Sequence, residues 1–187
     1  MQDAMEAYEA WADISENERT SDFQAYAYNI AEARYVTRRV TRIINEQAKK
    51  AGLDPLLHQA LLQALGTPRG DELAVGALAD RLDIAAAFAS RLVTRLEKMG
   101  LVKREPSTHD RRATNVTVTE EGVQKLKEID DAIHYHIAYF QQQLEDGQRR
   151  AALLIYAFYV GIDSSSPIAA AIRTSGSYRS TSAEEQK

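Results

Sequence analysis

Residues 100–122 read GLVKREPSTHDRRATNVTVTEEG, and more of the architecture follows from this stretch than from any other part of the chain. Two short β-prone runs, Leu101–Arg104 and Asn115–Val118, flank a polar, basic loop at 105–114. The stretch opens on a glycine suited to ending a helix, and Thr119 is suited to capping the next one. A helix, a β-hairpin and a second helix in this order are the pattern of a helix-turn-helix with a β-wing.

Two helices are predicted directly before this hairpin. Leu73–Leu82 repeats apolar residues at helical spacing, and Ile84–Met99 does so again after a turn at Asp83. The residues expected to face inward are Leu73, Ala77, Leu78 and Leu82 in the first helix and Ala89, Leu92, Val93 and Leu96 in the second. Two helices joined by a tight turn present the second one to the major groove of DNA, so the pattern indicates DNA binding rather than catalysis.

The outward side of the helix over 85–98 carries small and basic side chains. Its start is small enough to let the backbone approach DNA closely, while Arg91 is expected at base edges or phosphates and Arg95 at phosphate. The predicted DNA contacts of this helix are Ala86, Ala87, Ser90, Arg91, Thr94 and Arg95. The alternative is a solvated helix face. Phe88 also has two interpretations, contact with a thymine methyl group or burial in the core.

The loop of the hairpin carries Asp110, Arg111 and Arg112 at its tip. Arginine suits insertion into a narrow minor groove, so Arg111 and Arg112 are predicted DNA contacts. Asp110 is expected to pair with one of the arginines and so fix the loop. The alternative is that these three residues only tie the hairpin to the preceding helix.

The remaining chain is mostly helical by the same criteria, so the expected fold is mainly α with one small β-hairpin wing. The expected divisions are an acidic arm at 1–20, a helix for dimerisation or ligand binding at 21–52, the winged helix-turn-helix at 53–119, C-terminal dimerisation helices at 120–162 and a flexible tail at 163–187. Within the arm we expect a short helix at Ala4–Ala12. Ser21, Asp54 and Asp146 are the expected caps of later helices.

The helix that follows Thr119 carries an unusually long apolar seam. Its members are Val123, Leu126, Ile129, Ile133, Ile137, Phe140 and Leu144. One small domain does not need a seam of this length to cover itself. The seam therefore predicts contact with a second copy of the chain.

Composition sets broad limits on the class of protein. The chain has 187 residues, of which 44% are apolar, so it is long enough and apolar enough to bury a core. It has no cysteine, which excludes disulfides and thiolate metal sites. Its acidic N-terminus has no long apolar run, so we expect no signal peptide, no membrane span and a cytoplasmic location.

Charge is distributed unevenly along the chain. The whole chain has a net charge of −4, whereas residues 84–117 hold seven basic and three acidic residues and are therefore +4. The remainder is −8 by difference. A local positive region on an acidic body binds phosphate without making the whole surface attractive to polyanions.

With these motifs in place, the chain resembles the MarR family of winged helix-turn-helix transcriptional regulators. The matching residues are Leu78-Ala79, Leu82-Asp83-Ile84, Ser90–Val102, Arg104, Asp110-Arg111-Arg112, Val116–Thr119 and Gly122. The specific motifs cover residues 73–122, and the order of helices extends the resemblance to 22–162. The Asp-Arg-Arg signature and the Leu-Glu-x-x-Gly-Leu-Val phrase carry it together.

The resemblance implies a homodimer of winged-helix lobes joined through N- and C-terminal helices. It also implies a repressor that binds a palindromic double-stranded DNA operator and that small, often aromatic, ligands release. The sequence departs from the family pattern at 85–88, Ala-Ala-Ala-Phe, where hydroxylated residues are common, and at His109, where a second acidic residue is frequent. These departures bear on the cap of the recognition helix and on its base contacts.

The resemblance also places a ligand pocket between the dimer helices and the DNA-binding lobe. The candidate ligand residues are Tyr26, Arg34, Tyr35, Arg38, Arg42 and His58. A cationic strip beside tyrosines suits an aromatic carboxylate or the phosphates of its CoA thioester, and residues 52–62 resemble members that regulate aromatic-acid catabolism. Alternatively, the arginines form interhelical salt bridges or contact the DNA backbone, and His58 is a satisfied core residue.

Two other classes of function stay open at this point. A ligand-independent architectural DNA-binding protein would share these features. A small helical enzyme would need a catalytic constellation, and only Asp130, Asp131 and His134 cluster on one helix, without a glycine-rich phosphate loop. His134 and His136 stand two residues apart, which is a poor spacing for helical metal ligands. We therefore expect neither a metal nor a cofactor.

Overall fold

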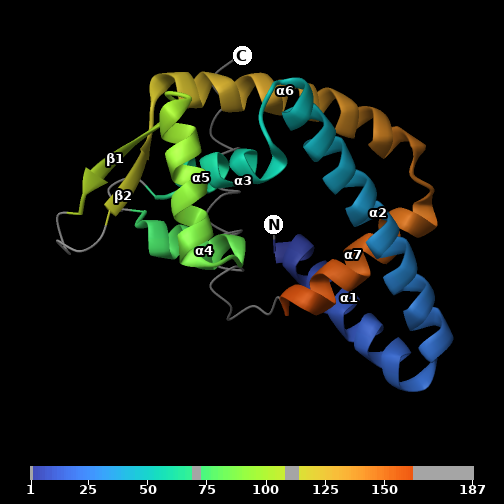
Figure 1. Ribbon diagram of the computed structural model, residues 1–187. Coiled ribbons are helices and arrows are strands. Elements are labelled where there is room, and N and C mark those ends of the chain that lie inside the picture. Colours follow the sequence, from blue (N-terminus) through green and yellow to red (C-terminus); the bar gives the residue numbers. More distant parts are fainter. Residues whose placement is uncertain (1, 69–72, 108–113, 162–187) are drawn as a thin grey trace, which may run out of the picture. The chain divides into compact units, whose positions relative to one another are not determined.

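The computed structural model describes residues 2–68, 73–107 and 114–161 (Figure 1). Its helices are α1 (Gln2–Ser21), α2 (Phe23–Lys50), α3 (Pro55–Leu65), α4 (Val75–Leu82), α5 (Ala86–Lys98), α6 (Glu120–Gln143) and α7 (Asp146–Val160). Its strands are β1 (Val102–Pro106) and β2 (Thr114–Val118), which pair antiparallel. The expected fold class, mainly α with a small β-hairpin, is confirmed.

The chain forms two compact units. The helical unit consists of Met1–Arg39 and Gln143–Lys187, and the winged unit consists of Val40–Gln142. Helix α2 contributes its first part to the helical unit and its last turns to the winged unit.

In the helical unit, α1 packs along α7. Met5 is buried against Tyr8 and Val160, and the rings of Tyr26 and Phe158 meet edge-on with centroids 6.0 Å apart. The expected short helix at Ala4–Ala12 is wrong, because α1 continues to Ser21. Helical stability in proteins comes mostly from packing, and the packing partner of α1 lies at the other end of the sequence.

Two of the expected helix caps are wrong by one residue. The backbone N–H of Ala25 donates to the Asp22 carboxylate over 3.1 Å, so Asp22 opens α2, whereas Ser21 is the last residue of α1. Helix α7 is capped by Glu145, which forms a reciprocal capping box with Gln148, and Asp146 is its first helical residue. In both places a carboxylate beside the expected residue reaches the free N–H groups.

The winged unit holds the main hydrophobic core, to which α2, α3, α4, α5, both strands and α6 contribute. Its largest fully buried side chains include Leu53, Leu57, Leu61, Leu78, Leu92, Leu96 and Ile129. The expected cap of α3 is confirmed, since Asp54 accepts from the backbone N–H of Leu56 over 3.0 Å and Pro55 begins the helix.

The chain just before α4 belongs to the hairpin. The backbone N–H of Val116 donates to the carbonyl of Leu73 over 3.0 Å, and Ala74 forms a β-bridge with Asn115. Helix α4 therefore begins at Val75 and not at Leu73 as expected. Ala77 is exposed, so its expected inward position is wrong, whereas the other three residues of that set are buried or half-buried.

The first half of the apolar seam on α6 is used within the chain. Leu126 and Ile129 are buried in the core of the winged unit, and Ile133 packs against it. The length of the seam predicted a dimer helix, and this part of it packs within the chain, while the dimer itself stays a prediction. The spacing of these residues predicted an apolar partner, but it did not indicate whether that partner belongs to the same chain or to a second copy.

Helix α6 starts in close contact with the end of α5 and the hairpin. The Thr119 hydroxyl donates to the carbonyl of Gly100 over 2.7 Å and accepts from the N–H of Gly122 over 3.0 Å, which confirms Thr119 as the cap. A Cβ added at Gly122 would lie 2.2 Å from the carbonyl oxygen of Leu101 and 2.7 Å from Val118 Cγ1. Only glycine lets α6 approach this closely.

We therefore expect Gly122→Ala to lower the free energy of unfolding by about 1–3 kcal/mol, because a backbone carbonyl must move to admit the methyl group. Gly76→Ala is the matched control, since a Cβ there meets nothing within 4 Å inside α4. The control should gain about 0.5–1 kcal/mol from helix propensity. Urea unfolding followed by circular dichroism measures both, and equal stability of Gly122→Ala and wild type would contradict the close approach.

Candidate nucleic-acid interface

The turn between α4 and α5 is built by a residue in the left-handed conformation. Asp83 has φ 52°, and its N–H reaches the carbonyls of Ala79 and Asp80 at the end of α4. Aspartate tolerates this conformation better than most side chains. The N–H of Ile84 then returns to Ala79 over 3.1 Å, and Ile84 packs against the core. The turn thereby fixes where α5 starts.

Helix α5 has one apolar face and one exposed face. Ala89, Leu92, Val93 and Leu96 are buried, as expected. Ala86, Ala87, Phe88, Arg91 and Arg95 are exposed, whereas Ser90 and Thr94 are half-buried. The helix begins at Ala86 after an extended Ala85 that supplies no side-chain cap. Phe88 is 38% exposed, so its burial in the core is the wrong interpretation.

Arg104 of β1 fastens the hairpin to α5. Its guanidinium donates to the carbonyl of Ser90 over 2.9 Å and to the hydroxyl of Thr94, and its Nε lies 3.4 Å from a carboxylate oxygen of Glu97. The Thr94 hydroxyl in turn donates to the Ser90 carbonyl over 2.8 Å. Thr94, expected to contact DNA, is therefore engaged within the protein.

The contacts of Arg104 with α5 were not predicted from the sequence. One signal was available, because side chains alternate along a strand and Arg104 shares a face with buried Val102. An arginine on the inner face of a short strand needs polar partners, and the helix directly before the hairpin supplies them. Asp110, Arg111 and Arg112, which are predicted to form the wing tip, lie outside the described residues.

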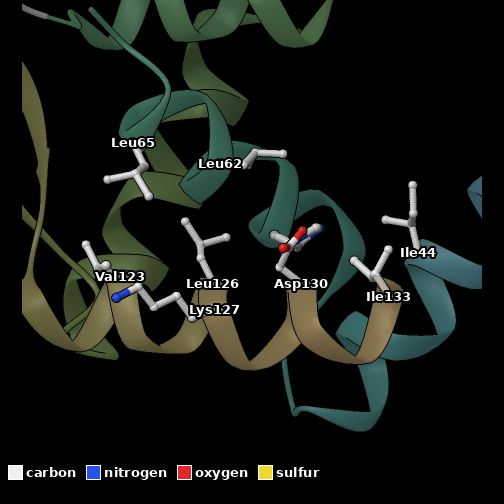
Figure 2. Close-up of a pocket in the computed structure, with 9 residues that line it drawn as sticks. Ile44, Leu62, Leu65, Val123, Leu126, Lys127, Asp130 and Ile133 are labelled. Atoms are coloured by element: carbon white, nitrogen blue, oxygen red, sulfur yellow. The ribbon is translucent and has the colours of Figure 1, made fainter. Parts of the chain in front are cut away.

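A cavity of about 360 Å³ lies inside the winged unit between α3 and α6, with the end of α2 at one side (Figure 2). Its lining residues are Ile44, His58, Leu62, Leu65, Val123, Leu126, Lys127, Asp130 and Ile133. Figure 2 shows the α6 side chains facing Leu62 and Leu65 of α3 across the cavity. The walls are mainly apolar, and the three polar side chains come from two helices.

His58 is the buried polar group of this cavity. It is 5% exposed, and its Nδ1 has no hydrogen-bond partner among the residues that the structure describes. Burial lowers the pKa of the imidazole below its ordinary value, and the nearby Asp130 carboxylate opposes this to a lesser extent. Ligand contact and burial in the core both stay predictions for His58, whose side chain is buried and also lines the cavity.

The other expected ligand residues do not gather in this cavity. Tyr26, Arg34, Tyr35 and Arg38 belong to the helical unit, and only Arg42 shares the winged unit with His58. Tyr26 is buried in an apolar cluster with Ala33 and Ile155. Arg34 lines a separate groove of the helical unit with Tyr156 and Tyr159. In the part of the chain that the structure describes, Arg34, Arg38 and Arg42 form no salt bridge.

A helix-turn-helix followed by a two-stranded hairpin, with the second helix exposed along one face, defines a winged-helix protein. Comparison with known proteins agrees with this class. The sequence model of the MarR family matches residues 51–113. A protein of Thauera aromatica, described as a transcriptional regulatory protein for the hcr operon, is 33% identical over 98 residues, which cover 52% of this chain and 57% of that protein. The chain thus spans little more than half the length of this relative.

Solved structures share the fold at lower identity. YusO from Bacillus subtilis has a TM-score of 0.55 and 21% identity, covering 76% of this chain and 99% of that one. A variant of MepR from S. aureus bound to an oligodeoxyribonucleotide has a TM-score of 0.51 and 16% identity, covering 62% of this chain and 83% of that one. The resemblance of the sequence to the MarR family is confirmed by the family model, which matches residues 51–113.

None of the described helices is long and apolar enough to cross a membrane. Histidine and carboxylate side chains within these residues form no group of three that would hold a metal ion.

The position of His58 predicts how stability depends on pH. The folded protein binds a proton at His58 less readily than the unfolded chain, whose histidines titrate near pH 6.5, about their ordinary value. The stability that a neutral His58 contributes is therefore complete above about pH 6.5 and is lost as pH falls below it, by at most about 1.4 kcal/mol per pH unit. His58→Gln should lose less stability on acidification than wild type.

The control is His134→Gln, because His134 is an exposed residue of the same unit. Thermal melts at a series of pH values from about 7.5 to about 5.5 span the titration of an ordinary histidine. The control should keep the wild-type pH dependence. An identical pH dependence of wild type and His58→Gln would contradict the burial of a neutral imidazole.

Proposed function

We propose that the chain is a dimeric transcriptional repressor that binds an operator in double-stranded DNA and is released from it by a small aromatic ligand. The observation that carries the proposal is the exposed face of α5, where Phe88, Arg91 and Arg95 stand on the second helix of a helix-turn-helix. Such a face fits the DNA major groove. Arg111 and Arg112 of the hairpin loop are proposed for the neighbouring minor groove.

Electrostatics supports this choice of partner. The segment 84–117 has a local charge of +4 on a chain of net charge −4. Arg91 and Arg95 stand exposed on it, and among the described residues neither pairs with a carboxylate. Arginines that form no ion pair on an exposed helix are available to phosphates and base edges.

The comparisons support the same class of activity. The relative from Thauera aromatica is described as a transcriptional regulatory protein, and the MepR variant is bound to an oligodeoxyribonucleotide. Both facts belong to those proteins. Their extension to this chain is part of the proposal, and it favours regulation of transcription over an enzymatic or purely architectural role.

The proposed second copy docks on the helical unit. Large aromatic side chains stand exposed there on α2 and α7, namely Phe23, Tyr28, Tyr35, Tyr156 and Tyr159. Aromatic residues are enriched in interfaces, because they bury much area for little loss of side-chain entropy. A dimer would present two α5 helices to two half-sites of an inverted repeat.

The proposed effector site is the cavity around His58. Its volume of about 360 Å³ falls in the range of small-molecule pockets, and its apolar walls suit one aromatic ring. The His58 imidazole and the Lys127 ammonium provide polar contacts for a carboxylate, whereas Asp130 repels one at its own position. Of a CoA thioester, only the acyl group would enter a cavity of this size.

DNA binding is tested by selecting duplexes from a randomised pool with the full-length protein. We expect inverted repeats to be enriched. In anisotropy titrations on a selected duplex, Arg95→Ala should weaken binding to all sequences alike and lower the slope of log affinity against log salt by about one per half-site. Arg91→Ala should relax the sequence preference instead.

Lys49→Ala is the control for this experiment, because Lys49 is an exposed cation at the end of α2 and away from α5. It should leave affinity and salt slope close to wild type. Selection that enriches no sequence, or an Arg95→Ala variant with an unchanged salt slope, would argue against α5 as the DNA-binding face.

Ligand binding is tested by thermal melts with benzoate, 4-hydroxybenzoate and benzoyl-CoA. A ligand at one hundred times its Kd raises stability by about 2.7 kcal/mol, and the effector should also weaken binding to the selected duplex. Leu62→Trp fills the cavity and should abolish both effects without weakening DNA binding. Gln59→Trp, on an exposed position of the same helix, should preserve both. DNA binding that no compound changes would favour the ligand-independent architectural alternative.

A further inference from the structure

Two exposed side chains on α5 form a pair. The guanidinium carbon of Arg91 lies 5.2 Å from the centroid of the Phe88 ring, at the distance of a cation–π contact. The two residues are one turn apart on the same face of the helix. Phe88 keeps 38% of its surface exposed, although a phenyl ring gains nothing from contact with water. The pair therefore stands ready for a partner with both a polar and an apolar part.

The ring limits where the guanidinium can go. A free arginine on a helix samples many rotamers, and ordering it on binding costs entropy. Contact with the aromatic face reduces that freedom, while the N–H groups at the edge of the guanidinium stay free to donate. A guanidinium held in this way suits the two acceptors, O6 and N7, that guanine presents in the major groove.

The ring itself also meets a specific chemical group in the major groove. The thymine C5-methyl is the apolar group that a base presents there. Neighbouring bases on one strand are spaced by about 3.4 Å. With its ring centroid 5.2 Å from the guanidinium carbon, Phe88 is within reach of the base pair next to the one that Arg91 contacts. The short side chains of Ala86 and Ala87 let this part of the helix lie close to the bases.

We propose that Phe88 and Arg91 read one dinucleotide together, with Arg91 donating to a guanine and Phe88 covering the methyl group of a thymine at the adjacent base pair. This inference rests on the proposed entry of α5 into the major groove and adds which bases it prefers there. Arg95 is one turn further along, and the structure gives it no aromatic partner among the described residues. It contributes affinity without this preference.

The test uses the full-length protein and duplexes selected from a randomised pool. The enriched half-site should contain a guanine next to a thymine. Replacing that thymine by deoxyuridine removes only the methyl group, and affinity should fall about fourfold per half-site, the factor for one buried methyl or methylene group. The same replacement elsewhere in the duplex should leave affinity unchanged.

Variants of Phe88 connect the methyl group to the ring. Phe88→Ala keeps the helix, since alanine is the best helix former, and should bind the thymine and deoxyuridine duplexes equally. Phe88→Tyr keeps the ring and should retain the difference between them. Arg95→Ala is the matched control on the same face, and it should weaken binding to both duplexes while preserving their ratio. Circular dichroism melts confirm that each variant is folded.

The outcomes separate this inference from the proposed function. Two results would overturn the joint recognition of a dinucleotide by Phe88 and Arg91 while leaving DNA binding intact. One is an enriched site without an adjacent guanine and thymine. The other is a Phe88→Ala variant that still distinguishes thymine from deoxyuridine. A pool from which no sequence is enriched overturns the proposed function and this inference with it.

Discussion

The close approach of α6 to the base of the hairpin, just after the end of α5, is the constraint on which the winged unit depends. The N–H of Thr119 donates to the carbonyl of Leu101 over 3.1 Å, and its hydroxyl reaches Gly100 and Gly122. These contacts join the last turn of α5, the base of the hairpin and the first turn of α6 at one point. Because Gly122 leaves no room for a side chain, the three elements hold a single mutual position.

The junction at Thr119 and Gly122 also determines the arrangement of the exposed face of α5. The hairpin starts from a fixed base, and Arg104 then ties its first strand to Ser90 and Thr94 in the middle of α5. The Ser90 carbonyl and the Thr94 hydroxyl on this side of the helix are thereby hydrogen-bonded within the protein. The opposite edge of the exposed face, with Phe88 and Arg91, has no such tie among the residues that the structure describes. The surface of one short helix is thus divided into a side that holds the hairpin and a side that we propose to contact DNA.

The sequence predicted what depends on local spacing and missed what depends on distant partners. The buried face of α5, the two strands and the Thr119 cap follow from periodicity and turn residues, which neighbouring residues determine. The length of α1 and the use of Leu126 and Ile129 depend on packing between segments far apart in the sequence. Similarly, the resemblance singled out His58 as a candidate, but only the fold shows that its Nδ1 is buried beside an apolar cavity without a partner among the described residues.

The same contacts connect the cavity to the exposed face of α5. One wall of the cavity is α3, which packs directly on α5, and the other is α6, whose first turn is locked to the base of the hairpin. A molecule between these walls contacts the two elements that hold α5 in place. It shifts the equilibrium between conformations only if it fits one spacing of α3 and α6 better than another. Since α3 packs directly on α5, the effect of a ligand on α5 would pass through α3.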